Sequence, residues 1–210
     1  MSTTLIALHG FTQNGALMKA ALEPLASRLP AGLQLECPDG PNACAEASVD
    51  RMHQILGGAR QAPPYLCWFD ATDDGREYRG FEATKQRLGE LIAARGGRTG
   101  LLGFSQGAIC AASLAALSVH GRFPRIDFVI LVAGRVPRAD EVGPLLEAPL
   151  PMPSLHIRGQ RDPIAKGHVE ALAERFDAGQ RELVLWAGPH VVPTRGEGAD
   201  AIVRFIERQA

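Results

Sequence analysis

One serine in the sequence stands in a setting that could make it a nucleophile. Ser105 is the centre of Gly103-Phe104-Ser105-Gln106-Gly107, which follows the apolar run 100–102 and precedes the Ala- and Leu-rich stretch 108–117. A strand, a G-x-S-x-G turn and a helix in this order are typical of a nucleophile elbow, whose strained turn presents the serine at the carboxyl end of a sheet. Glycines let strand and helix approach closely across the turn. The alternative is a glycine-rich turn with an incidental serine.

A serine hydroxyl needs a base that removes its proton and an acid that orients this base. In hydrolases built on such an elbow, the chain order is serine, then Asp or Glu, then His. His190 lies in loop 187–193 after the last predicted strand, so we expect it to be the base. His9 is the nearest alternative, but it precedes the serine, and we interpret it as shaping the oxyanion loop. The other histidines lie on predicted helices or inside a strand: His53, His120, His156 and His168.

The expected acid is Asp162, which follows the predicted strand that ends at Ile157. This position places its carboxylate at the same sheet edge as the serine. The alternative is that Asp162 only caps the next helix, with Pro163 as the first helical residue. Asp140 is the next candidate, although it stands beside a helix start. The remaining downstream aspartates precede a strand or lie in or beside helices: Asp127, Asp177 and Asp200.

An oxyanion hole in this type of site uses the backbone N–H after the nucleophile and one from the loop after an early strand. Here these are the N–H groups of Gln106 and Phe11. We expect an apolar rim around the site and assign Trp68 and Val191 as substrate-binding candidates. Residues 39–64 are expected to build most of the pocket. The rim residues share an apolar side chain near the site: Phe11, Trp68, Phe104, Val191 and Val192.

Short apolar runs alternate with helical patterns along the chain, which predicts one doubly wound α/β domain over residues 1–210 with a mostly parallel sheet. Such sheets bind ligands at the carboxyl ends of their strands. Strands are predicted at 4–8, 33–37, 65–69, 100–102, 128–132, 154–157 and 183–186. Helices are predicted from Leu17 to Leu29, where Pro30 ends the first, near 52–56, at 81–92, 108–117, 140–147 and 169–176, and around 201–206.

Composition excludes several classes of function. The net charge is −1 with both signs scattered along the chain, so no basic stripe predicts nucleic-acid or anionic-membrane binding. No apolar stretch approaches the length of a membrane span. The four cysteines show no metal-ligand spacing with histidine, so we expect no metal and no cofactor. Free thiols and the lack of a signal peptide predict a cytoplasmic protein. We also expect it to be a monomer or a homodimer.

Six sequence strings, taken in order, resemble the FSH family of serine hydrolases. They are Leu8-His9-Gly10-Phe11-Thr12-Gln13-Asn14-Gly15, Trp68-Phe69-Asp70, Glu77-Tyr78-Arg79-Gly80, Gly103-Phe104-Ser105-Gln106-Gly107-Ala108, Pro153-Ser154-Leu155-His156 and Gly188-Pro189-His190-Val191-Val192-Pro193. The resemblance spans residues 3–207. It implies an α/β-hydrolase fold, carboxylesterase or thioesterase activity, and the triad Ser105, Asp162 and His190. Pro189 stands where the family usually has glycine, and the Gly-Phe-Ser-Gln-Gly string also occurs in acyl-protein thioesterases.

The sequence therefore predicts a serine hydrolase that cleaves carboxylic esters or thioesters through an acyl-enzyme on Ser105. The expected partner is a small acyl ester or thioester. A peptidase or amidase would need the same residues, so that alternative stays open. A binding module without catalysis, on the same fold, is the alternative from another class of protein.

Overall fold

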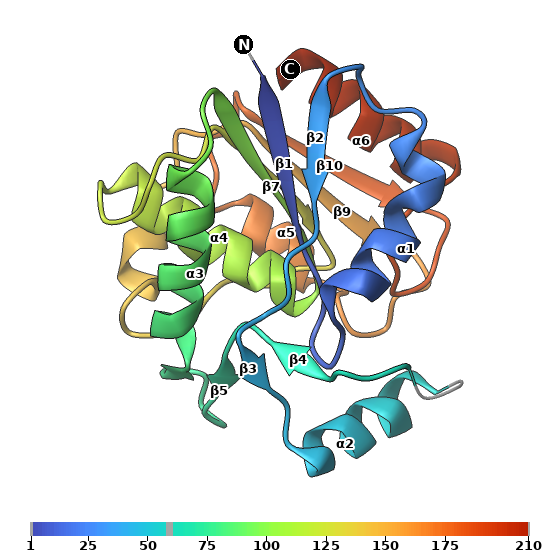
Figure 1. Cartoon of the computed structure of the whole chain (residues 1–210), viewed down its shortest axis with the longest axis vertical. Coiled ribbons are helices and arrows are strands. Elements are labelled where there is room, and N and C mark those ends of the chain that lie inside the picture. The colour runs from blue at the N-terminus through green and yellow to red at the C-terminus, as the bar shows by residue number, and fades with distance from the viewer. Residues whose placement is uncertain (1, 58–60, 210) are drawn as a thin grey trace.

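The computed structural model describes residues 2–57 and 61–209 and is built around a six-stranded sheet in the order β10-β9-β8-β7-β1-β2 (Figure 1). Every pairing in this sheet is parallel. The strands are β1 (Thr3–Leu8), β2 (Leu33–Glu36), β7 (Arg98–Phe104), β8 (Phe128–Val132), β9 (Ser154–Gly159) and β10 (Arg181–Trp186). Because all of them run in one direction, their carboxyl ends meet at one edge of the sheet.

Helices cover both faces of the sheet, which confirms the predicted doubly wound fold. α1 (Gly15–Ala26) and α6 (Gly196–Gln209) pack on one face, and α3 (Phe81–Ala93) and α4 (Gln106–Val119) pack on the other (Figure 1). Successive strand residues point to opposite faces, so a strand buried on both sides is apolar throughout. In β1, for example, Leu5 joins the core under α1 and α6, whereas Ile6 joins the core under α3 and α4.

The segment between β2 and β7, the second and third strands of the large sheet in chain order, differs from the prediction. The expected strand at 65–69 is wrong: only Leu66–Cys67 (β4) is extended, and it pairs antiparallel with Asn42–Ala43 (β3), outside the large sheet. The reason is that the backbone of the next two residues bonds to side chains instead of a neighbouring strand. The segment that follows holds a second short ribbon, formed by β5 (Asp70–Ala71) and β6 (Tyr78–Arg79).

Three helices also differ in extent from the prediction. The first helix ends at Ala26, because the N–H groups of Arg28 and Leu29 bond to carbonyls three residues back and the chain tightens into turns before Pro30. Residues 140–147 hold only a short 3-10 helix, Gly143–Leu146. The helix predicted at 169–176 is the shorter α5 (His168–Ala173).

One helix stands apart from the layers. α2 (Glu46–Leu56) is longer than predicted and lies beyond the carboxyl edge of the sheet, away from the other helices (Figure 1). Val49 is its only buried residue. Among residues 2–57 and 61–209, the helices are all too short or too polar to cross a membrane.

Candidate active site

Ser105 occupies the sharp turn between β7 and α4. Its backbone has φ 53° and ψ −114°, a conformation that L-residues rarely adopt and that marks stored strain. Its N–H donates to the carbonyl of Val132 at 2.9 Å, which holds the turn against the next strand. A Cβ on Gly103 would lie 2.3 Å from the carbonyl oxygen of Gly107, and one on Gly107 would lie 2.2 Å from that of Leu8. Both glycines are therefore required by the close approach of backbone.

His190 bridges the serine and an aspartate. Its Nε2 lies 3.2 Å from Oγ of Ser105, and its Nδ1 lies 2.7 Å from Oδ2 of Asp162. The side chains of His190 and Asp162 are buried, with exposed fractions of 7% and 0%. Since the carboxylate accepts a hydrogen bond from Nδ1, the neutral ring carries its proton there and presents the lone pair of Nε2 to the serine. This geometry allows His190, acting as a general base, to remove the proton from the hydroxyl of Ser105.

Asp162 serves two purposes with two oxygens. Oδ2 faces His190, while Oδ1 accepts from the N–H groups of Ile164 and Ala165 at 2.9 and 3.0 Å. The helix cap that the sequence offered as an alternative is wrong, because α5 begins at His168 with Gly167 as its N-cap, and Pro163 lies in a turn. The two bonds to Oδ1 instead fix the orientation of the carboxylate, because they hold this oxygen against the turn that follows β9.

Backbone contacts join the loop after β9, which carries Asp162, to the loop 187–193, which carries His190. The N–H of Arg161 donates to the carbonyl of Gly188 at 2.9 Å. A Cβ on Gly159 would lie 2.3 Å from that same carbonyl oxygen, so the two loops touch directly. Pro189, the departure from the family pattern, is exposed, and His190 keeps both of its contacts beside it.

The competing carboxylates lie elsewhere. Asp140 is exposed and forms an ion pair with Arg76 at 2.9 Å. Asp127 accepts from the N–H of Thr99, at the amino end of the sheet. Asp177 accepts from the N–H of Gly179 in a local turn, and Asp200 accepts from Arg28, which follows α1.

His9, the competing base, is fully buried and engaged at both ring nitrogens. Its Nδ1 donates to the carbonyl of Gly10 at 2.8 Å, and its Nε2 accepts from the N–H of Gly40 at 2.9 Å. Burial lowers the pKa of His9, which matches the neutral ring that this pattern needs. Neither nitrogen is available to take a proton from Ser105, so His9 instead helps to hold the loop after β1 in place.

Phe11 and Gln106 carry the backbone N–H groups that the sequence assigns to an oxyanion hole. Phe11 follows β1 in a turn whose next residue, Thr12, has φ 62°, and Gln106 is the first residue of α4. Within the part of the chain that the structure describes, neither N–H has a protein acceptor. The positive end of α4 adds to the attraction for negative charge at this point.

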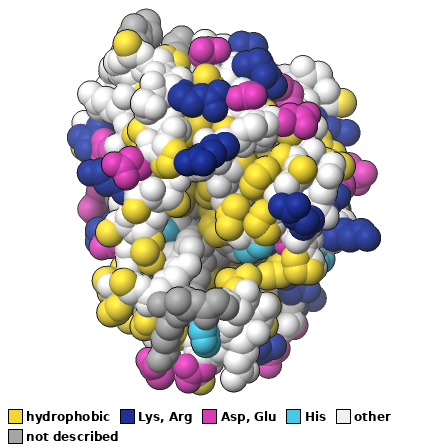
Figure 2. Space-filling model, turned by 90° about the vertical axis from the view of Figure 1, so that its right-hand side faces the viewer, with side chains coloured by type: hydrophobic (Ala, Val, Ile, Leu, Met, Phe, Trp, Pro, Cys, Tyr) yellow, Lys and Arg dark blue, Asp and Glu magenta, His cyan; other side chains and the backbone are white. Residues whose placement is uncertain are grey.

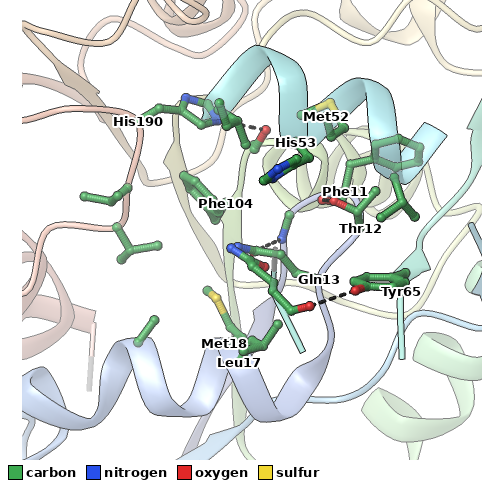
Figure 3. A pocket seen from close by; sticks show the side chains of 18 of the residues that line it. Phe11, Thr12, Gln13, Leu17, Met18, Met52, His53, Tyr65, Phe104 and His190 are labelled. Atoms are coloured by element: carbon green, nitrogen blue, oxygen red, sulfur yellow. Dashed lines mark hydrogen bonds between the residues drawn. The ribbon is translucent and has the colours of Figure 1, made fainter. Parts of the chain in front are cut away.

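A cavity of about 310 Å³ opens beside Ser105 and His190 (Figure 3). Its walls come from the loop after β1, from α1, from α2 and from the histidine loop. In Figure 3, Leu17 and Met18 lie on one side of it and Met52 and His53 on the other. Its lining is mostly apolar: Gly10, Phe11, Thr12, Gln13, Leu17, Met18, Ala21, Val49, Met52, His53, Leu56, Gly57, Gln61, Tyr65, Phe104, Ser105, His190, Val191 and Val192.

The two substrate-binding candidates have different positions. Val191 lines the cavity and is 46% exposed. Trp68 is fully buried and does not line the cavity, so its assignment to the rim is wrong. Its indole N–H donates to the carbonyl of His9 at 2.8 Å, which turns the ring into the core behind the oxyanion loop.

Sequence reasoning missed the wall formed by α1. The spacing of Leu17 and Ala21 predicted a helix but no role in the pocket, and both residues line the cavity together with Met18. The buried residues of α1 are Gly15, Met18, Leu22 and Leu25, and Met18 also lines the cavity. The signal for the pocket is the pair of apolar residues that lie beside this buried stripe, Leu17 and Ala21. In α2, Met52 and Leu56 follow the same helical spacing toward the cavity, as the assignment of the pocket to 39–64 predicts in part.

Within residues 2–57 and 61–209, no group of three or more His, Cys, Asp or Glu side chains is placed to hold a metal ion. The arrangement of serine, histidine, aspartate and two free N–H groups is what acyl transfer to a hydroxyl nucleophile uses.

Comparison with known proteins shows the fold and the family to which the chain belongs. The fold is that of α/β-hydrolase esterases and thioesterases: the structure of acyl-protein thioesterase 2 from Zea mays superposes with a TM-score of 0.70 at 19% identity, covering 99% of this chain and 93% of that one. A family model described as "Serine hydrolase (FSH1)" matches residues 1–202. The chain belongs to this family and is a serine hydrolase.

Curated relatives extend over almost the whole chain. The human protein named Esterase OVCA2 is 32% identical over 221 residues, covering 98% of this chain and 96% of the relative. Its bovine counterpart is 29% identical over 220 residues, with the same coverage of both chains. The suspected family membership is therefore confirmed, and the chain is similar to esterases along its full described length.

Proposed function

We propose that this protein hydrolyses carboxylic esters or thioesters through an acyl-enzyme on Ser105. The observation that carries the proposal is the bridge made by His190, whose two ring nitrogens reach the serine and Asp162 at 3.2 and 2.7 Å. A histidine held in this tautomer is a general base toward the serine and a general acid toward a leaving group.

In the proposed reaction, Oγ of Ser105 attacks the acyl carbonyl while His190 takes the hydroxyl proton. The N–H groups of Phe11 and Gln106 bind the oxyanion of the tetrahedral intermediate. His190 then protonates the departing alcohol or thiol, and Asp162 stabilises the imidazolium in between. A water molecule, activated by the same histidine, releases the acid and restores the serine.

The substrate class follows from the cavity. Apart from His190 and His53, the lining contains no basic or acidic side chain, with no Lys, Arg, Asp or Glu among the described residues. In Figure 2, hydrophobic side chains gather beside the hollow on this face, whereas charged side chains lie mostly toward its periphery. Such a site suits an uncharged acyl chain, and each buried methylene contributes about 0.8 kcal/mol, or roughly fourfold in kcat/KM.

The preference between ester and thioester is tested with two matched series, p-nitrophenyl esters and acyl thioesters, from acetyl to dodecanoyl. We expect kcat/KM to rise with chain length and then to level off where the cavity ends. Peptide amides with the same acyl groups should react far more slowly, because the amine leaving group needs fuller protonation. A flat or falling series contradicts the apolar pocket, and a preference for amides contradicts the esterase assignment.

Labelling by a fluorophosphonate separates catalysis from simple binding. A serine activated by His190 reacts with this probe, and a binding module without an activated serine does not. We expect labelling of the native chain and none of a Ser105→Ala variant. Labelling that persists in the variant would show that the nucleophile is another residue.

A further inference from the structure

The two N–H groups assigned to the oxyanion come from different parts of the fold. Phe11 lies in the loop after β1, and Gln106 begins α4. Strand β1 pairs with β7 only as far as Leu8, opposite Gly103. Beyond this point the sheet no longer fixes the backbone that leads to Phe11. Other contacts must hold this loop at a constant distance from the elbow.

On the loop side, side chains bind the three backbone polar groups directly before the Phe11 N–H. The carbonyl of His9 accepts from the indole N–H of Trp68 at 2.8 Å. The N–H of Gly10 donates to Oε1 of Gln13 at 2.9 Å, and the carbonyl of Gly10 accepts from Nδ1 of His9 at 2.8 Å. The carbonyl of Gly10 belongs to the same planar peptide group as the Phe11 N–H, so these contacts, together with the bond from the N–H of Gln13 to that carbonyl, set the direction of the Phe11 N–H.

On the elbow side, the side chain of Gln106 reaches the same tryptophan. Its Oε1 accepts from the main-chain N–H of Trp68 at 3.0 Å, and its Nε2 donates to the carbonyl of Phe69 at 2.8 Å. The carbonyl of Trp68 accepts from the side chains of Thr84 and Asn42. All three polar groups of Trp68 are thus bonded, and two of them join the oxyanion loop to the residue after the nucleophile.

We infer that Trp68 is a positioning residue that fixes the Phe11 N–H relative to the Gln106 N–H. It lies outside the cavity and acts through His9 and Gln106. If the loop shifts relative to the elbow, one of these two bonds must break. Preorganised donors stabilise the transition state only when both reach the developing oxyanion. Trp68 should therefore affect kcat much more than KM. This inference rests on the proposed function.

The test compares Trp68→Phe with a matched core variant, Phe176→Leu. The first keeps a buried ring and the main-chain bonds but removes the indole N–H. The second changes a fully buried ring in the same core cluster that bonds to neither oxyanion segment. For both, we would measure Tm, kcat, KM and the inhibition constant of an alkyl trifluoromethyl ketone, whose adduct with the serine carries an oxyanion.

We expect Trp68→Phe to lower kcat about 10- to 100-fold with KM within about twofold, and to weaken the ketone in the same proportion. Phe176→Leu should lower Tm while kcat stays within about twofold. The inference is overturned by an unchanged kcat in Trp68→Phe, by equal losses of kcat in both variants, or by a loss of kcat without loss of ketone affinity.

Two further measurements keep the outcomes distinct. If Trp68→Phe does not fold, Gln106→Met removes the side-chain bonds to Trp68 and Phe69 but keeps its own N–H, and the same quantities are expected to change in the same direction. If the native protein is not labelled by a fluorophosphonate, the proposed function itself fails. A labelled native protein with a fully active tryptophan variant overturns only the positioning role.

Discussion

Two of the walls that line the cavity are built in different ways. One carries Ser105 and His190, with Asp162 bonded behind the histidine, and stands on the carboxyl ends of β7, β9 and β10, where hydrogen bonds tie its loops to one another. The other is α2, which lies beyond the sheet and buries only Val49. Reacting groups need positions fixed to a fraction of an ångström, whereas an apolar chain needs only a surface to contact.

We propose that the first wall carries the chemistry and that the second selects the substrate. Changes on the sheet side should reduce turnover for every substrate. Changes on α2 should alter the dependence on acyl chain length and leave short substrates nearly unaffected. The experiments below test this division, beginning with the side where the effects are largest.

The largest losses are expected at the nucleophile and the base. Ser105→Ala and His190→Ala should each lower kcat on the order of 10⁴-fold or more, because the members of a triad act as a unit and removing one disables the others. Steady-state kinetics with a p-nitrophenyl ester gives the rates, and circular dichroism checks the fold. A His190 variant that retains activity while a His9 variant is inactive would move the base to His9.

Asp162→Asn should come next, with a loss of up to about 10⁴-fold in kcat. The amide oxygen can still accept from Ile164 and Ala165, so the turn after β9 keeps its cap. The amide nitrogen donates, however, and cannot accept from Nδ1 of His190, so the ring adopts the wrong tautomer. Tm should change little compared with Asp162→Ala, which loses both contacts. A rate near that of the native enzyme would leave Asp162 only its structural role in the turn that follows β9.

His9→Asn should have an intermediate effect, about 10- to 100-fold on kcat with little change in KM. The asparagine amide can replace Nδ1 as donor to Gly10, but it leaves the buried N–H of Gly40 without the acceptor that Nε2 provides. The loop after β1 should therefore hold the Phe11 N–H less precisely but keep it near the oxyanion. Parallel measurement of kcat and of trifluoromethyl ketone inhibition checks this, and a rise in KM alone would contradict it.

The sequence was sufficient for the wall built on the sheet and insufficient for the other. A buried strand, a tight turn and a helix leave little freedom in where Ser105 points, and parallel strands bring Asp162 and His190 to the same edge. The prediction failed at Trp68, because an apolar side chain next to a site can face either the cavity or the core. Only the hydrogen bond from its indole to His9 decides between them.

Residues 39–64 were the hardest stretch to place for a related physical reason. Strand and helix periodicity report which side of an element faces a core. α2 has almost no core contact, so its pattern is set by the cavity instead. For the same reason the spacing in α1 predicted a helix but not that Leu17, Met18 and Ala21 line the cavity.

The smallest predicted effect is also the sharpest test of the division between the walls. Leu56 and Ile55 are neighbours near the end of α2, both large, apolar and exposed, at 47% and 55%. Leu56 lines the cavity and Ile55 does not. Leu56→Ser should lower kcat/KM for long acyl chains severalfold, since each lost methylene contact is worth up to about 0.8 kcal/mol, and should leave acetyl and propionyl esters within about twofold.

Ile55→Ser is the matched control, because it changes the same kind of side chain on the same turn of the helix without touching the cavity. It should leave the whole chain-length series unchanged. If both variants lower activity equally at every chain length, α2 acts by supporting the fold, and the assignment of selectivity to it is wrong. If only Leu56→Ser alters the series, and only for long acyl chains, α2 is the wall that determines the preference for chain length.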